Sequence, residues 1–445
     1  MANKINKYEA QLRESPSLKN MHLPTGKKGD QEDPNNTLYS VHQRGKQKTL
    51  WYLSSWESMD AHNVPTNKEL VTYRSKTYPY HGLHRSLLTT VTPEIKTKDN
   101  YKVRFCDDLF ISMVNEFKLI LNDTELQYGN DKFLAFDLKN RDNWSKISSE
   151  LGNKQSLTKW SDHLDSESLS LYLPWCYSRG KSDYFPLNFC GKNDTLEHVI
   201  EFNLKLSDLL MMQDQNGDLV EFNSEKIEVA GNADSVPIPE MEGLYTTLTS
   251  KECEYNNCLQ DEVNGEKEYY TESIYYIEDE NESNLGKKVQ LKIDSKKKQP
   301  VTEIFWGAIN KTKSSQTKSL VFTNNGKNPV KLTRLESSVG VILDNKSSYK
   351  TELGYNLFSK KNLKTKGINY WQNSVISNED DKKFQPGINF STGNITITLD
   401  NENNAEKFMA FGILKHTNRF VFKNYPKNQE ERLRNGCTIK SDDDI

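Results

Sequence analysis

Hydrophobic and polar residues alternate along much of the chain from about residue 51 onward. In the segment ITITL, Ile395, Ile397 and Leu399 would lie on one face of a strand, with the two threonines on the other. A period of two is typical of a strand that buries one face. The turn signal Pro386-Gly387 stands shortly before this segment. We therefore predict a half-buried strand that must pack against a second sheet.

The same alternation predicts strands in both halves of the chain. The other segments with this pattern are 101–106, 115–122, 198–206, 288–293, 302–309, 329–335, 340–343, 407–414 and 419–422. Few segments have a helical period, since residues 107–114 and 205–212 have mixed patterns. Short strands separated by polar turns are typical of antiparallel sandwiches or barrels, and there are too many here for one sandwich.

Composition and turn signals divide the chain into four segments. Residues 1–50 are polar and rich in lysine, asparagine, glycine and proline, so we expect an N-terminal arm. The turn-rich sequence QDQNG is expected to separate a first β domain, 51–213, from a second, 218–425. Within the second domain, the acidic and tyrosine-rich stretch 251–286 is expected to be a surface loop insertion. Residues 426–445 are expected to form a charged tail.

Charge and composition limit the classes of function. The aromatic content of 10% in 445 residues argues against general disorder. The net charge of -3 lacks the positive surplus that a protein coating nucleic acid needs. No run approaches the roughly 18 apolar residues of a membrane span, and the first residues lack the apolar core of a secretory signal. We therefore expect folding in the cytoplasm, with the 6 scattered cysteines reduced.

Candidate catalytic and metal-binding residues are few. The sequence has no Gly-x-Ser-x-Gly, P-loop or His-Glu-x-x-His motif. His81 and His84 would point to different faces of an extended segment, and Cys253 and Cys258 lack a second cysteine pair. We therefore predict no catalytic residue, cofactor or metal site. A hydrolase stays an alternative, as does a carbohydrate-binding β-sandwich (lectin), because YYTESIYY (269–276) clusters aromatic side chains.

Four motifs, in order along the chain, resemble the double jelly-roll major capsid proteins of large DNA viruses. The segments 114–136 and 173–204 resemble strands and turns of the first jelly roll. QPVTEIFWGAI (299–309) resembles a strand of the second, and FQPGINFS (384–391) resembles the family's Pro-Ser-Gly-x-x-Asn-Phe-Ser segment without its first serine. The motif residues that match are Pro174, Trp175, Pro186, Pro300, Glu303, Trp306, Pro386, Gly387 and Asn389.

This resemblance, which spans about residues 73–414, implies an all-β fold of two consecutive jelly-roll domains behind an N-terminal arm. It implies a structural viral protein and no enzyme, in which a homotrimer forms a pseudo-hexameric capsomer that tiles an icosahedral shell. The implied partners are neighbouring capsomers and minor capsid and penton proteins, with an inner viral membrane left open and no specific nucleic acid. The implied location is the virion, after assembly in the host cytoplasm. The alternative within this class is a trimeric scaffold that forms a temporary lattice.

Overall fold

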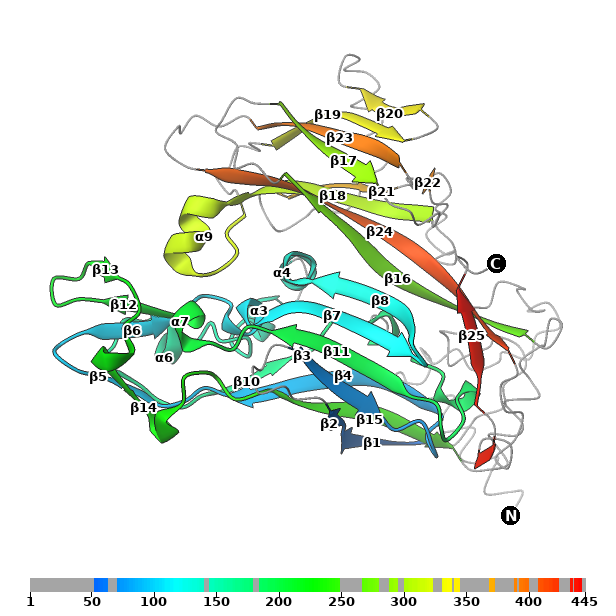
Figure 1. Ribbon diagram of the computed structural model, residues 1–445, viewed down its shortest axis with the longest axis horizontal. Coiled ribbons are helices and arrows are strands. Elements are labelled where there is room, and N and C mark those ends of the chain that lie inside the picture. Colours follow the sequence, from blue (N-terminus) through cyan, green and yellow to red (C-terminus); the bar gives the residue numbers. More distant parts are fainter. Residues whose placement is uncertain are drawn as a thin grey trace, which may run out of the picture.

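The computed structural model describes residues 52–62, 70–139, 144–178, 184–248, 266–279, 288–294, 300–322, 330–337, 340–344, 368–372, 388–389, 392–399, 407–423, 433–434 and 436–441. Four main β-sheets lie one above another in this structure (Figure 1). Two sheets are built from residues 52–248 and two from residues 266–441, and their paired strands are antiparallel. The prediction of two antiparallel β-sandwiches is confirmed.

The first sandwich consists of a five-stranded sheet that packs against a four-stranded sheet. The larger sheet has the order β2 (Asp60–His62), β3 (Leu70–Ser75), β11 (Leu196–Phe202), β7 (Val114–Leu121), β8 (Thr124–Asn130). The smaller sheet has the order β1 (Tyr52–Ser58), β15 (Glu240–Leu248), β4 (Gly82–Val91), β10 (Ser168–Leu171). Two small sheets lie at one end, with the orders β13 (Leu219–Val220), β12 (Leu210–Gln213), β6 (Lys102–Phe105) and β14 (Ile227–Val229), β5 (Ile95–Thr97), β9 (His163–Leu164).

The second sandwich consists of a six-stranded sheet that packs against a four-stranded sheet. The six-stranded sheet has the path β16 (Glu266–Glu278), β24 (Phe408–Lys423), β18 (Pro300–Asn310), β21 (Ile368–Gln372), with β22 (Ile388–Asn389) paired to β18 and β25 (Thr438–Ser441) paired to β24. The outer sheet has the order β17 (Lys288–Asp294), β23 (Thr392–Leu399), β19 (Val330–Ser337), β20 (Gly340–Asp344).

The helices are short, and none of them was predicted as a helix from the sequence. The helices are α3 (Leu109–Ser112), α4 (Asp131–Lys139), α5 (Trp144–Ile147), α6 (Gln155–Thr158), α7 (Leu206–Leu209) and α9 (Lys311–Thr317). Helices α4 and α9 each follow an asparagine, Asn130 or Asn310, whose side chain accepts a hydrogen bond from an amide of the first turn. Among the described residues, no helix is long and apolar enough to cross a lipid bilayer.

The alternating strand at ITITL is confirmed. Ile395 and Ile397 in β23 are fully buried, and the neighbouring strand β17 buries Val289 and Leu291 on the same face. A Cβ atom added at Gly412 of β24 would lie 3.2 Å from Cδ1 of Ile395. Strand β23 therefore packs against the opposed six-stranded sheet, as its period predicts.

The turn at residues 213–217 is the tip of a hairpin and does not separate the two sandwiches. It joins β12 to β13, and the amide of Asp214 donates to the carbonyl of Asp218 across the tip. Strand β15, which lies after this turn, pairs with β1 and β4 of the first sandwich. We therefore propose a boundary after Leu248 in place of 213–218.

The loop expected at 251–286 and the tail expected at 426–445 both contain a strand. Residues 266–278 form β16, which pairs with β24 along its whole length, so this part of the expected loop insertion was wrongly assigned. In the C-terminal segment, residues 438–441 form β25, which pairs with residues 420–423 at the C-terminal end of β24. The N-terminal arm, 1–50, lies outside the described residues.

Replacing Trp306 in β18 tests the core of the second sandwich. Its side chain is only 1% exposed, so Trp306→Ala should lower the free energy of unfolding by about 3–5 kcal/mol. Trp56→Ala is the matched control, because the Trp56 side chain is 43% exposed, and it should cost less than about 1 kcal/mol. Denaturant unfolding measures both variants, and equal stabilities would place Trp306 outside the core.

Candidate functional site: the sheet shared by the two sandwiches

The six-stranded sheet β16-β24-β18-β21 is called the shared sheet below, and its central strands β18 and β24 are buried on both faces. Residues 301–310 of β18 and 408–414 of β24 are buried at every position. Successive side chains along these strands point to opposite faces. The side chains that pack with the first sandwich are Phe305, Ile309, Met409, Phe411 and Ile413. Those that pack in the core of the second sandwich are Ile304, Trp306, Ala308, Phe408, Ala410 and Leu414.

Helix α4 lies between the shared sheet and the first sandwich, and aromatic rings fill this boundary (Figure 1). The ring of Phe136 on α4 lies 4.3 Å from that of Phe305 on β18, measured between centroids. Phe185 of the first sandwich contacts Tyr269 of β16 in an edge-on arrangement at 5.2 Å. Such pairs add to the apolar area that they bury. The boundary is therefore packed like a domain interior.

Hydrogen bonds from the shared sheet cover the edge of strand β8. Strand β8 ends its own sheet, and an edge strand leaves backbone groups without partners in the ladder. The hydroxyl of Thr271 on β16 donates to the carbonyl of Leu126 at 2.5 Å, and the Ser273 hydroxyl accepts from the amide of Tyr128 at 2.9 Å. Together with the side-chain amide of Asn418 on β24, which also donates to the carbonyl of Leu126 at 3.4 Å, these two side chains satisfy a buried edge.

The family-motif residue Glu303 belongs to an ion cluster across three strands of the shared sheet. Nζ of Lys415 on β24 lies 3.3 Å from a carboxylate oxygen of Glu303 on β18 and 3.0 Å from one of Glu272 on β16. The side chains of Lys415 and Glu303 are largely buried, so each charge needs its partner. The cluster fixes the register of the three strands.

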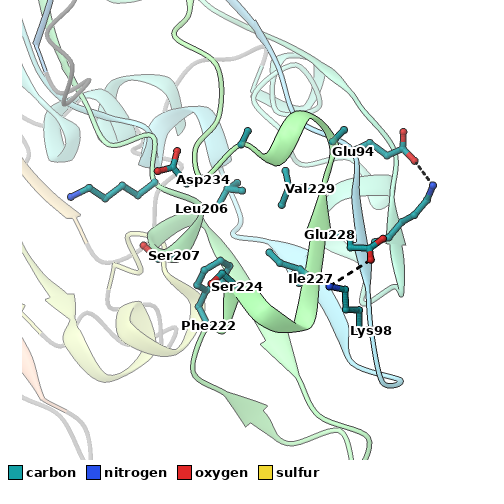
Figure 2. Close-up of a pocket in the computed structure, with 14 residues that line it drawn as sticks. Glu94, Lys98, Leu206, Ser207, Phe222, Ser224, Ile227, Glu228, Val229 and Asp234 are labelled. Carbon is teal, nitrogen blue, oxygen red and sulfur yellow. Dashed lines mark ion pairs between the residues drawn. The ribbon is translucent and has the colours of Figure 1, made fainter.

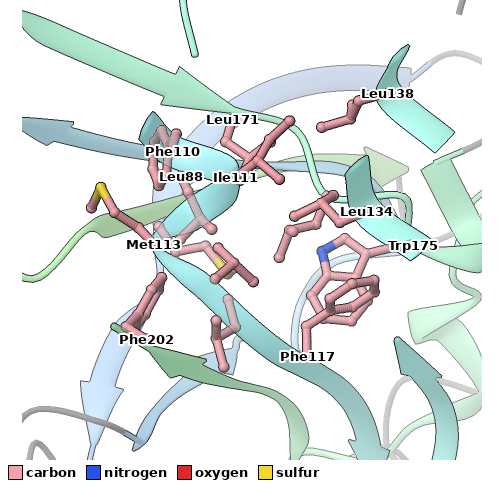
Figure 3. Packing of buried hydrophobic residues seen from close by; sticks show 14 of the residues in the cluster. Leu88, Phe110, Ile111, Met113, Phe117, Leu134, Leu138, Leu171, Trp175 and Phe202 are labelled. Atoms are coloured by element: carbon pink, nitrogen blue, oxygen red, sulfur yellow. The ribbon is translucent and has the colours of Figure 1, made fainter. Parts of the chain in front are cut away.

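The motif residue Trp175 is fully buried in the core of the first sandwich, where it lies beside Phe117 (Figure 3). Its ring contacts that of Phe117 edge-on at 5.2 Å. The flanking backbone is held by Gln127 of β8, whose side-chain amide donates to the carbonyl of Pro174 at 3.0 Å and accepts from the amide of Cys176 at 2.8 Å. Gln127 thus ties the motif segment to the strand that meets the shared sheet.

His198 is a buried titratable residue that the sequence analysis did not single out. It lies in β11, is 0% exposed, and its Nε2 shares a hydrogen bond of 2.8 Å with the hydroxyl of Tyr177. Its ring also contacts Trp175 edge-on at 5.0 Å. Burial lowers the pKa of His198 to about 3, because apolar surroundings disfavour the charged ring. Its position two residues before Ile200, on the inward face of an alternating strand, is the signal that could have revealed it.

The other motif residues occupy corners and strand ends. Pro186 is buried and stands directly before the 3₁₀ turn Leu187–Phe189. Pro300 begins β18 and pairs with Asn389 of β22. Pro386 and Gly387 lie outside the described residues. The structure therefore brings Glu303, Trp306 and Pro300 together on one strand, while Pro174 and Trp175 lie in the first sandwich.

A pocket of about 960 Å³ lies at the end of the first sandwich, beside β5 and β14 (Figure 2). Its charged rim is paired, since Lys96 lies 2.9 Å from Glu94 and Lys98 lies 3.5 Å from Glu228. Among the lining residues that the structure describes, none is a histidine or a cysteine. This lining offers apolar contacts and exposed ion pairs, with no nucleophile beside a base.

The histidines and cysteines considered as ligands are placed as follows. The rings of His81 and His84 both stack on Tyr184, with centroids 6.0 Å and 5.6 Å away. Cys253 and Cys258 lie outside the described residues. A different group, Cys190, Asp194 and Cys437, comes together from distant parts of the chain and was not predicted, because nothing in the local sequence links residue 437 to residue 190.

Solved structures of viral capsid proteins have the same fold. No model of a known protein family matches the sequence, and no curated protein matches it either. VP54 of PBCV-1, fitted into a reconstruction of the virophage Sputnik, has a TM-score of 0.59 at 10% identity, covering 85% of this chain and 96% of that one. The Faustovirus major capsid protein has a TM-score of 0.58 at 10% identity, covering 94% and 98%. The mavirus major capsid protein has a TM-score of 0.50 at 9% identity, covering 90% and 92%.

At these identities the likeness establishes the fold alone. The matches span most of this chain and nearly all of the compared chains. The two sandwiches are therefore two consecutive jelly rolls, and the predicted fold class is confirmed.

Replacing Thr271 tests the hydrogen bonds between the shared sheet and β8. Thr271→Val keeps the shape of the side chain but removes the donor to Leu126, so it should lower the free energy of unfolding by about 1–3 kcal/mol. Thr271→Ser keeps the hydroxyl and serves as the control, with a smaller loss. Denaturant unfolding measures the stability of both variants. A valine variant as stable as the wild type would show that this hydrogen bond does not stabilise the fold.

Replacing His198 tests its burial in the neutral form. An unfolded histidine has a pKa of about 6.5, and the folded value is about 3. Between these values the unfolded chain binds a proton that the folded chain does not, so the stabilising contribution is present above about pH 6.5 and is lost as the pH falls toward 3. The stability advantage of the wild type over His198→Gln should therefore shrink by up to about 1.4 kcal/mol per pH unit in this window. Unfolding curves at several pH values measure it, and a difference that is constant with pH would contradict the assignment.

Proposed function

We propose that this protein is a major capsid protein, whose trimers form capsomers of pseudo-hexagonal outline in an icosahedral shell. The observation that carries the proposal is the full-length likeness of fold to viral capsid proteins, with two jelly rolls in one chain. A fold does not by itself fix a function, so the proposal is an argument from architecture. In a shell protein, however, the architecture is the working part.

The shared sheet supports this role, because it joins the two jelly rolls through a packed interior. A single rigid chain then presents two similar bodies of antiparallel strands. Three such chains around an axis would place six similar bodies in a ring, which is a shape that tiles a surface. A shell needs identical units, and a packed boundary with directed hydrogen bonds keeps every unit the same.

The proposed partners are a second and third copy of the chain, neighbouring capsomers, and minor capsid and penton proteins. Residues 1–50 are proposed to tie units together, since polar arms of this composition order on binding. The proposed location is the virion shell, assembled in the host cytoplasm. The proposal assigns the protein no catalytic activity, and no described residue suggests one.

The observation behind the carbohydrate-binding alternative has a structural explanation. In the segment YYTESIYY, Tyr269 is buried against Phe185, and the hydroxyls of Tyr275 and Tyr276 donate to Asp294 and Glu278. These tyrosines belong to a strand of the shared sheet and form no exposed aromatic platform for a sugar.

The oligomeric state tests the proposal. The purified chain should be a trimer at micromolar concentration and neutral pH, with a mass three times that of the 51.4 kDa chain, because obligate assemblies bury more than about 2,000 Å². Light scattering coupled to size exclusion measures the mass. A stable monomer would contradict the capsid reading, and the presence of the protein in mature particles would separate a capsid protein from a temporary scaffold.

A further inference from the structure

Two buried cysteine thiols meet at the boundary between the jelly rolls. The ligand atoms of Cys190, Asp194 and Cys437 lie within 4.8 Å of one another, and all three residues are buried. The two sulfur atoms therefore lie within 4.8 Å of each other. The described cysteines, Cys106, Cys176, Cys190 and Cys437, are all thiols in this structure.

One carboxylate holds the backbone on both sides of this pair. Oδ2 of Asp194 accepts from the amide of Gly191, next to Cys190, at 2.6 Å and from the amide of Cys437 at 2.8 Å. Oδ1 of Asp194 accepts from the side chain of Asn122 at 2.8 Å. Directed hydrogen bonds therefore hold the backbones of the two cysteine segments close to each other.

The two cysteines belong to different structural units. Cys190 follows the 3₁₀ turn Leu187–Phe189 in the first jelly roll. Cys437 stands directly before β25, which pairs with β24 of the shared sheet. A covalent bond between them would tie the C-terminal strand of the second jelly roll to the body of the first.

We propose that Cys190 and Cys437 are a disulfide-forming pair that locks the C-terminal strand across the boundary between the two jelly rolls when the protein meets an oxidant. In the reducing cytoplasm the pair stays as thiols, and it closes in an oxidising medium. The inference concerns the isolated chain and does not depend on the proposed capsid function.

The reaction is a thiol–disulfide exchange with a low-molecular-weight disulfide such as oxidised glutathione. The Cys437 thiol, the more exposed of the two, loses its proton to solvent, and its thiolate attacks one sulfur of that disulfide, which releases one thiol. The Cys190 thiol then loses its proton and attacks the mixed disulfide at Cys437, which releases the second thiol. Two protein thiols are oxidised by two electrons, and one small disulfide is reduced to two thiols.

The surroundings set the rate of this exchange. The neighbouring Cys190 thiol, burial and the Asp194 carboxylate all raise the pKa of the Cys437 thiol. The reactive thiolate is therefore scarce at neutral pH, so closure should be slow and should accelerate as the pH rises. The folded protein therefore resists rapid accidental oxidation of the pair.

Metal binding by Cys190, Asp194 and Cys437 is less well supported than disulfide formation. A structural zinc ion takes four ligands, and this group provides three. The two carboxylate oxygens of Asp194 together already accept three hydrogen bonds from N–H donors. The carboxylate thus has a structural role in positioning the two thiols.

The experiment equilibrates the full chain, purified with reductant, in buffers of reduced and oxidised glutathione. Free thiols are then trapped with an alkylating reagent, and peptides are mapped by mass spectrometry without reduction. We expect a Cys190–Cys437 linked peptide, and a rise of the thermal midpoint by roughly 5 °C on oxidation. Cys190→Ala and Cys437→Ala should lose this rise, whereas Cys106→Ala, a buried cysteine elsewhere, should keep it.

Three results would overturn the proposal. The first is the absence of the linked peptide after full equilibration with the oxidant, which needs no variant to fold. The second is an oxidation shift that persists in Cys437→Ala. The third is a tightly bound metal ion that is retained by the wild type, lost in Cys437→Ala and released by a chelator, since this would assign the group to metal binding.

Discussion

The structure depends on one sheet that must be buried on both faces. Strands β18 and β24 carry apolar side chains toward both jelly rolls, so neither jelly roll can cover the shared sheet alone. Separation would expose Phe305, Phe411 and Ile413 to water, and each such side chain contributes about 1.5–3 kcal/mol when buried. The two jelly rolls are therefore halves of one folded body rather than independent beads on a chain.

Apolar packing holds the halves together, but polar contacts decide how they are oriented. The hydrophobic effect has no direction, whereas hydrogen bonds do. The hydroxyls of Thr271 and Ser273 meet backbone groups of β8, and Lys415 links three strands of the shared sheet through Glu303 and Glu272. These contacts select one register and one relative position of the jelly rolls. A protein whose proposed function is to repeat many times in a shell needs this uniqueness.

The sequence predicts the strands that alternate and also β18 and β24, which are buried on both faces, but it misses β16. Strands β17 and β23 alternate in the sequence and were found, because their outer faces are solvated. Strand β16 was assigned to a loop, because its sequence is rich in glutamate and tyrosine. Its inward side chains include the small polar residues that form hydrogen bonds with the backbone of β8. The short helix α4 was also missed. Its buried residue Phe136 packs against a strand of the other jelly roll, and the local sequence does not show this contact.

The pairing of strands that are distant in the sequence also could not be predicted. The hairpin at residues 213–217 has the local signature of a linker, and only the pairing of β15 with β1 and β4 places the following strand in the first jelly roll. The motif residues Trp175 and Trp306 were recognised by resemblance, and both are core residues. The hydrogen bonds of Gln127, His198 and Asp194 depend on neighbours that the fold brings from other segments.

Negative-stain electron microscopy of the purified protein shows whether three double jelly rolls gather around one axis. Two fused jelly rolls per chain and three chains per particle predict a particle with threefold symmetry, a hexagonal outline and six lobes. Particles with two lobes, or rings without threefold symmetry, would contradict the account.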